Sequence, residues 1–274
     1  MKKTLFSLST FVLFNCAAHG ATTIFHYSVS DTDAAGLPTI PSVGGSDGTA
    51  QGTFSGVLSV NVPTIGVPAG AGNRSIVGAA AAGSEGVNSA GTQELSNASI
   101  IAEGGYAMEA WFLWNGGGST NGSVNSIIDY AGTEKFRAQP GGLDYNFDLG
   151  SGAVPVAIAT PGQWHYVAMV FEHDGAAEVG GQIGGTATFY FDGVTPVSST
   201  AVVKDDFGDS LNRPIGVGRH PLGFGGDRFD GLVYEPRVSL GALDSSELLF
   251  TAIPEPGSSL LAGLGALLLF RRRR

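Results

Sequence analysis

Acidic side chains gather in two short stretches and are the first candidates for chemistry. Glu172, Asp174 and Glu178 fall close together in the chain. Paired carboxylates are the catalytic groups of many glycoside hydrolases, and retaining enzymes hold them about 5–5.5 Å apart across a cleft. Carboxylates on one strand face would alternate with apolar residues, whereas these three lie in the glycine-rich stretch 172–185. The pattern therefore predicts a solvated hairpin loop rather than a catalytic pair.

The second acidic stretch holds Asp205, Asp206 and Asp209. Oxygen-rich loops can bind calcium, which takes about 6–8 oxygen ligands. The stretch lacks the spacing of an EF-hand, so a solvated loop is the favoured interpretation. Calcium remains the alternative, and the sequence indicates no other cofactor. Asp192 and Asp230 also stand near turns, and a hairpin explains Asp192 more simply than a metal does.

The remaining reactive residues show no catalytic spacing. His26, His165, His173 and His220 are scattered without the spacing of metal ligands. No Ser, His and Asp can be grouped into a triad from the sequence, and no Lys-Ser or Lys-Thr pair follows the glycines of 181–185 to form a phosphate loop. We therefore expect no enzyme activity.

Aromatic rings are the other candidates, because they can stack on sugars. We expect Trp111, Trp114 and Trp164 to pack in the core, because they fall on strands whose two faces are both apolar. Residues nearer to loops are better candidates for a sugar-binding face: Tyr145, Phe147, Phe207, Phe224 and Phe229.

Short strands separated by glycine turns must position these groups. Residues 107–114 alternate so that one face carries Met108, Ala110, Phe112 and Trp114, and the other carries Trp111 and Leu113. Both faces are apolar, which predicts a strand covered on both sides. The strongest strand is 163–171, and 186–191 runs into Asp192-Gly193, a hairpin signal. Further strands are expected at 24–29, 54–62, 126–130, 143–149, 213–218 and 229–234.

Helical signals are weak. Pro236 interrupts the last strand and predicts an edge or a bulge there. Residues 244–247 have capping-box spacing for one short helical turn, and nothing else in the body looks helical. Many short strands with glycine turns are typical of an all-β sandwich.

The body is unusually acidic and rich in glycine. The chain has 274 residues, 43 of them glycine, and a formal net charge of −10. Residues 21–253 hold 8 basic and 23 acidic residues, a net charge of −15. Such a body repels nucleic acids and anionic lipids.

The N-terminal residues read as a secretory signal peptide, residues 1–20. Lys2 and Lys3 precede an apolar stretch, and small residues follow it, so we expect cleavage by signal peptidase between Gly20 and Ala21. A membrane anchor and a lipid-modified Cys16 are the weaker alternatives. Cys16 is the single cysteine, so the cleaved chain would have neither disulfides nor a thiol.

The C-terminal residues 251–274 have a three-part layout. Pro254, Glu255 and Pro256 are followed by an apolar run at 257–270 and then by Arg271, Arg272, Arg273 and Arg274. The run is short of the roughly 20 residues of a spanning helix, and the arginines should stay cytoplasmic. This layout resembles the PEP-CTERM sorting signal of Gram-negative bacteria. The resemblance implies cleavage near the motif by an exosortase, after transient insertion into the inner membrane. A permanent anchor is the alternative.

Four motifs in the body come in a recognisable order: Glu109-Ala110-Trp111, 164–168 (WHYVA), 190–193 (YFDG) and 229–237, which ends in Glu235-Pro236-Arg237. Together they resemble the LamG-like, concanavalin A-like jelly-roll domains. The resemblance is clearest at 105–250 and implies one sandwich over 21–250, flanked by a signal helix and a C-terminal hydrophobic helix. Tyr234 stands where that family usually has an acidic residue, so a calcium site at that edge does not carry over.

These features predict an exported protein of the cell surface or extracellular matrix. Its LamG-like domain would be a non-catalytic binding or structural module, with exopolysaccharide or surface proteins as partners. One alternative is a calcium-dependent, lectin-like module. A less favoured one is a concanavalin A-like glycan hydrolase or lyase.

Overall fold

The computed structural model describes thirteen stretches of the chain, which run from residue 21 to residue 250 with gaps. They are 21–29, 39–40, 44–45, 48–50, 58–68, 71–78, 87–89, 95–117, 125–130, 134–147, 152–204, 215–219 and 229–250. The expected signal helix and the C-terminal hydrophobic helix lie outside these ranges. No helix inside them is both long and apolar enough to cross a membrane.

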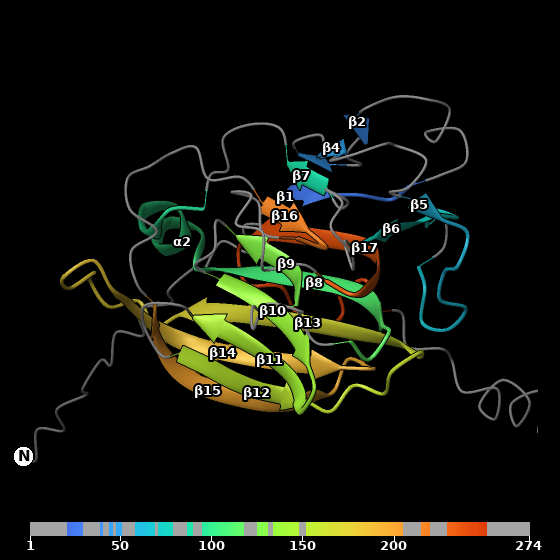
Figure 1. The fold of residues 1–274 in the computed structure, drawn as a ribbon. Coiled ribbons are helices and arrows are strands. Elements are labelled where there is room, and N and C mark those ends of the chain that lie inside the picture. The colour runs from blue at the N-terminus through green and yellow to red at the C-terminus, as the bar shows by residue number, and fades with distance from the viewer. Residues whose placement is uncertain are drawn as a thin grey trace, which may run out of the picture.

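The described strands form two antiparallel sheets that pack face to face (Figure 1). The nine-stranded sheet has the order β15 (Pro196–Lys204), β14 (Ile183–Phe191), β13 (Trp164–His173), β8 (Gly105–Trp114), β17 (Gly231–Leu240), β1 (Thr22–His26) and β3 (Gly44–Gly45), with β6 (Ser75–Val77) beside β17 and β5 (Leu58–Ser59) beside β6. The eight-stranded sheet has the order β12 (Gly152–Ala157), β11 (Gly142–Phe147), β10 (Glu134–Gln139), β9 (Ser126–Tyr130), β16 (Ile215–Val217), β7 (Val87–Ser89), β4 (Gly48–Ala50) and β2 (Thr39–Ile40).

Strand β8 shows why the sandwich has two apolar layers. Met108, Ala110, Phe112 and Trp114 face the core between the sheets, whereas Ala107 and Trp111 belong to a second cluster on the outer face of the nine-stranded sheet. All ten residues of β8 are buried. The predicted two-sided strand is therefore confirmed, and its central place between β13 and β17 explains why both of its faces are apolar.

Most of the expected strands lie within one to three residues of the observed ones. Residues 126–130 form β9, and β13 and β14 meet in an antiparallel pair as expected. The hairpin between β14 and β15 turns at Asp192, whose φ is 53°. Of 54–62, only Leu58–Ser59 forms a described strand.

One element corrects the sequence predictions and another confirms them. A helix, α2 (Asn97–Glu103), was not expected; it is capped by Ser96, whose side chain accepts from the Ser99 N–H, and it ends at Gly104 in the left-handed region. The turn predicted at 244–247 is present, with the Glu247 carboxylate accepting from the Asp244 N–H at 2.8 Å.

Strand β17 has the bulge that was predicted at Pro236, but it is not an edge strand. Its first residues pair with β6, and Arg237–Leu240 pair with β1. The register against β8 shifts between Tyr234 and Arg237, and Glu235 there has a φ of 49°. Pro236 lacks an N–H, so the bulge is where β17 can change its neighbour without losing a ladder bond.

Candidate functional site

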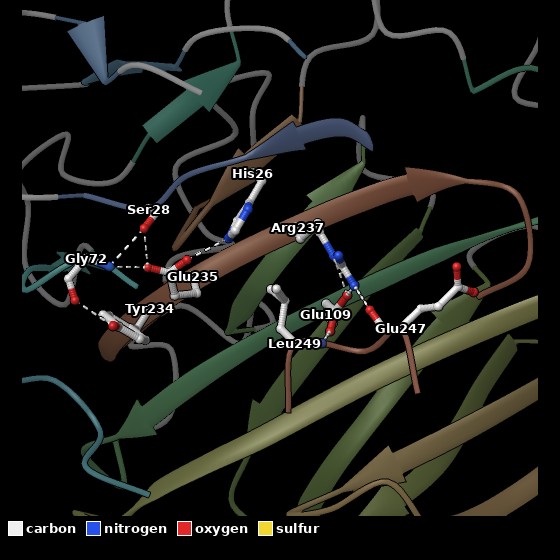
Figure 2. Close-up of polar contacts among 9 residues, drawn as sticks. All are labelled: His26, Ser28, Gly72, Glu109, Tyr234, Glu235, Arg237, Glu247 and Leu249. Carbon is white, nitrogen blue, oxygen red and sulfur yellow. Dashed lines mark hydrogen bonds and ion pairs between the residues drawn. The ribbon is translucent and has the colours of Figure 1, made fainter. Parts of the chain in front are cut away.

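Glu109 forms the centre of a buried polar network on the outer face of the nine-stranded sheet (Figure 2). Its Oε1 accepts from the Arg237 guanidinium, with Nε at 2.6 Å, and its Oε2 accepts from the Tyr166 hydroxyl at 2.5 Å and the Leu249 N–H at 2.7 Å. Arg237 also donates to the Glu247 carbonyl at 2.6 Å. The network therefore fixes the closing segment 241–250 onto the sheet.

Glu235 forms a second polar network at the bulge of β17 (Figure 2). Its carboxylate is within 2.6 Å of His26 Nε2, and it accepts from the Ser28 hydroxyl and the Gly72 N–H at 2.7 Å each. The neighbouring Tyr234 hydroxyl donates to the Gly72 carbonyl at 2.5 Å. Three donors offset the cost of a non-glycine residue at positive φ, and they join β1 to the segment before β6.

His165 and Asp192 join two of the sequence motifs. Asp192 lies 2.7 Å from His165 Nδ1 and accepts from the Tyr166 N–H at 2.8 Å, while His165 Nε2 accepts from the Thr160 N–H at 2.9 Å. The last bond requires an unprotonated Nε2, so Nδ1 carries the proton and donates to Asp192. Both ring nitrogens are engaged within the protein, so this pair positions a hairpin and is not poised as a general base.

Glu134 is buried between the two sheets. It accepts from the hydroxyl of Tyr106 and, at 2.8 Å, from that of Tyr145. Burial raises the pKa of both tyrosines well above its ordinary value, and the nearby Glu134 carboxylate raises it further. The cluster therefore holds its hydroxyl protons at physiological pH.

The outer face of the eight-stranded sheet is charged. Arg137 and Asp144 stand opposite each other on β10 and β11 and form a bidentate ion pair at 2.5 and 2.9 Å. Gln139 also donates to Asp144, at 3.0 Å. Asp129, Lys135 and Asn146 occupy neighbouring register positions and are buried.

A cavity of about 420 Å³ opens on the outer face of the nine-stranded sheet. Four aromatic residues from three segments line it: Trp111, Trp164, Tyr166 and Phe250. Gln163, Asp192 and the stretch Pro63 to Ile65 complete the lining. The Trp164 indole N–H donates to the Asn61 side chain at 3.1 Å. Aromatic walls with a few polar groups are typical of small-molecule sites, and this cavity is our candidate binding site.

The structure places the predicted acidic loop as expected. Glu172, Asp174 and Glu178 are exposed around the hairpin that joins β13 and β14, although Glu172 still belongs to β13. Asp205, Asp206 and Asp209 lie outside the described residues, as do Gly20, the Pro254 to Pro256 motif and the terminal arginines. Among the described residues, no group of three or more His, Cys, Asp or Glu could hold a metal.

The choice of aromatic residues for a sugar face was wrong for the three of the five that the structure describes. Tyr145, Phe147 and Phe229 are fully buried in the core between the sheets, and Phe207 and Phe224 lie outside the described residues. Trp111 packs in a buried cluster and Trp164 packs against it, as expected, and both also line the cavity. Sequence spacing could not have shown this, because the outer face is covered by segments distant in the chain.

Comparison with known families agrees with this fold. A family profile described as the concanavalin A-like lectin/glucanases superfamily matches residues 87–249, more than half of the chain. The chain therefore belongs to this superfamily. The PEP-CTERM protein-sorting motif matches residues 252–274, which marks the protein for export and sorting to the cell surface by an exosortase. No curated protein matches the chain.

Solved structures of similar shape are distant. Trypanosoma rangeli sialidase in complex with 2,3-difluorosialic acid is 12% identical, with a TM-score of 0.48 over 84% of this chain and 32% of that one. The binding domain of botulinum neurotoxin DC in complex with rat synaptotagmin II is 11% identical, with a TM-score of 0.48 over 82% of this chain and 50% of that one. The chain thus spans between a third and a half of these structures, and the likeness is too distant to transfer a function.

Proposed function

We propose that this protein is an exported surface protein whose concanavalin A-like domain is a non-catalytic module that binds extracellular glycan. Signal peptidase and an exosortase are its processing partners. Exopolysaccharide is the binding partner that we favour. The finished protein resides on the cell envelope or in the extracellular matrix, after transient anchoring of its tail in the inner membrane.

The hydrogen bonds of three buried carboxylates support the non-catalytic role. Glu109, Glu134 and Glu235 each accept at least two hydrogen bonds from the protein itself. A general acid or base must instead be free to reach a proton on the substrate. These three groups hold the fold together and are not free for substrate.

Charge supports the choice of a glycan partner. The body of residues 21–253 carries a net charge of −15, which repels polyanions and favours neutral partners or cations. The cavity adds an aromatic surface beside polar groups, the combination that recognises carbohydrate without a metal.

The test is affinity electrophoresis of the full-length protein through gels containing polysaccharide from the host's own matrix, combined with an assay for released reducing ends. We expect retardation without release. Release of reducing ends above a buffer control would show a hydrolase, and unchanged mobility in every gel would contradict glycan binding. Calcium removal with EDTA distinguishes the lectin-like alternative, because our account expects unchanged mobility.

A further inference from the structure

Three aromatic rings pack on one another at the base of the cavity, and Phe250 is the most exposed of them. The ring centroids of Trp111 and Tyr166 are 4.7 Å apart, those of Tyr166 and Phe250 are 5.2 Å apart, and Trp111 and Phe250 stack at 6.4 Å with planes 17° apart. Rings this close are in mutual contact. Trp111 and Tyr166 are each 1% exposed, so the aromatic rings that reach the cavity surface are the half-buried Trp164 and Phe250.

The position of Phe250 depends on a glycine. A Cβ at Gly66 would lie 2.5 Å from the Phe250 ring, and the φ of Gly66 is +73°. Phe250 is therefore seated between the 61–68 segment and the sheet. Because the Leu249 N–H is bonded to Glu109, the backbone that carries this ring is fixed as well.

Polar groups stand at the cavity and retain hydrogen-bonding capacity. The Asp192 side chain is 44% exposed and accepts two bonds within the protein, although a carboxylate has about four lone-pair sites. Gln163 and Thr64 are exposed beside it. The site can therefore accept bonds from hydroxyl groups and, through Gln163 and Thr64, donate bonds to them.

Trp111 supplies an independent sign of a missing partner. Its side chain lines the cavity and is 1% exposed, and its indole N–H is buried without a hydrogen-bond acceptor among the described residues. Buried donors in native proteins are nearly always paired, and each exception calls for an explanation. A bound ligand oxygen would provide one.

The arrangement of the rings decides which ligand fits. A cage for an organic cation surrounds the charge with rings that each face it. Here Trp111 and Tyr166 are packed away from the cavity surface, and only Trp164 and Phe250 are open to a ligand, too few rings to surround a cation. Asp192 and the acidic body disfavour an anionic ligand. A pyranose ring fits both conditions, because it has a face of C–H groups and a rim of hydroxyls.

We infer that this cavity binds one neutral pyranose residue of a glycan, stacked on Trp164 and Phe250 and bonded at its rim to Asp192 and Gln163. This inference rests on the proposed glycan-binding function and specifies its site. Ile65, which is 63% exposed at the cavity, supplies further apolar contact at the mouth.

The experiment titrates the full-length protein with the methyl glycosides of glucose, galactose, mannose and N-acetylglucosamine, followed by tryptophan fluorescence. Two of the three tryptophans line the cavity, and Trp114 lies in the core as an internal reference. We expect at least one neutral glycoside to give a saturable change. Trp164→Ala should weaken that binding by about tenfold or more, which corresponds to about one stacking contact.

A second variant and a matched control protect the test against misfolding. Ile65→Trp adds bulk at an exposed position at the mouth and should block binding while the protein stays folded. Val179→Ala changes an exposed apolar residue at the β13–β14 hairpin, at the far end of β13 from Trp164, and should bind as the wild type does.

The outcomes separate this inference from the proposed function. If matrix polysaccharide retards the wild type and the Trp164→Ala and Ile65→Trp variants equally, the glycan site lies elsewhere and the inference is wrong, although the function stands. Saturable binding of tetramethylammonium, or of methyl glucuronate in preference to every neutral glycoside, would also overturn it. Absence of binding to any glycoside or polysaccharide would overturn both.

Discussion

The outer faces of the two sheets differ in their side chains: one is apolar and covered by another segment of the chain, and the other carries charged groups that pair with one another. On the nine-stranded sheet, an aromatic cluster around Trp111 and Tyr166 is covered by the closing segment 241–250, and one carboxylate, Glu109, fixes that cover. On the eight-stranded sheet, Arg137 and Asp144 form an ion pair on the outer face beside Asp129, Lys135 and Asn146. The apolar face is buried by segment 241–250, and the cavity lies at the edge of this segment.

Ionisable residues of the four sequence motifs pair with one another. Glu109 of the first motif pairs with Arg237 of the last, and His165 of the second pairs with Asp192 of the third. Motif residues that resemble catalytic acids and bases are therefore partners of one another. Their spacing is dictated by the sandwich, because β8 lies between β13 and β17.

Loss of the Glu109 charge should have the largest effect. Glu109→Gln leaves the mostly buried Arg237 without its counter-charge and weakens the hold on segment 241–250, so we expect a loss of about 3–5 kcal/mol in unfolding free energy. Urea unfolding measures it. Glu172→Gln is the matched control: it makes the same change at an exposed position on the adjacent strand β13 and should alter stability by less than about 0.5 kcal/mol. Equal losses of unfolding free energy in the two variants would show that the Glu109 network does not hold segment 241–250 on the sheet.

Removal of the ion pair on the charged face should cost less. Arg137→Ala leaves Asp144 with the Gln139 donor and some access to water, so we expect a loss of about 1.5–3 kcal/mol by the same measurement. A loss greater than that of Glu109→Gln would reverse the proposed ranking of the two faces.

Alkaline pH should probe the aromatic face. Burial, and then the Glu109 carboxylate, raise the pKa of Tyr166 well above its ordinary value. The unfolded chain ionises this tyrosine near pH ~10 while the folded chain keeps the proton, so its contribution to stability is complete below about pH 10 and falls as the pH rises further. Each such tyrosine adds about 1.4 kcal/mol per pH unit to the slope.

The matched variant for this slope is Tyr166→Phe, which removes one titrating group. Its stability should fall less steeply than that of the wild type between about pH 10 and about pH 11. Parallel curves would mean that Tyr166 ionises equally in both states, which would contradict its burial.

The smallest effect is expected at the α2 cap. Ser96→Ala removes the acceptor for the Ser99 N–H and should cost about 1 kcal/mol. α2 lies at one end of the sandwich and not on either outer face (Figure 1). This variant should therefore leave binding at the cavity unchanged, and reduced glycan binding would show that the cavity responds to general loosening of the fold.

Local patterns predicted the central strands well, because a strand buried on both faces has a continuous apolar signature. Strands β8, β9 and β13 were found in this way, and the Asp192-Gly193 pair located the end of β14 and its turn. β10 was missed because Lys135, Arg137 and Gln139 make its outer face look like a loop. α2 was missed because Ser99, rather than Glu or Gln, closes its capping box.

The candidate site was beyond sequence patterns for a different reason. The cavity is built from Trp111, Trp164 and Phe250 with the 63–65 stretch, which are brought together only by the sandwich. Alternation along a strand shows that Trp111 has an apolar neighbourhood, and it cannot distinguish a packed core from a covered outer face. The pairing of Glu109 with Arg237, 128 residues apart, is equally invisible to local periodicity.

We propose that a non-catalytic domain is delivered to the cell surface after two cleavages. The two ends of the mature protein show whether those cleavages occur. Intact mass spectrometry of the protein recovered from its host should find an N-terminus at Ala21 and a C-terminus between Pro254 and Gly257. A protein that still carries Arg271 to Arg274 and must be extracted from the membrane would contradict processing by an exosortase.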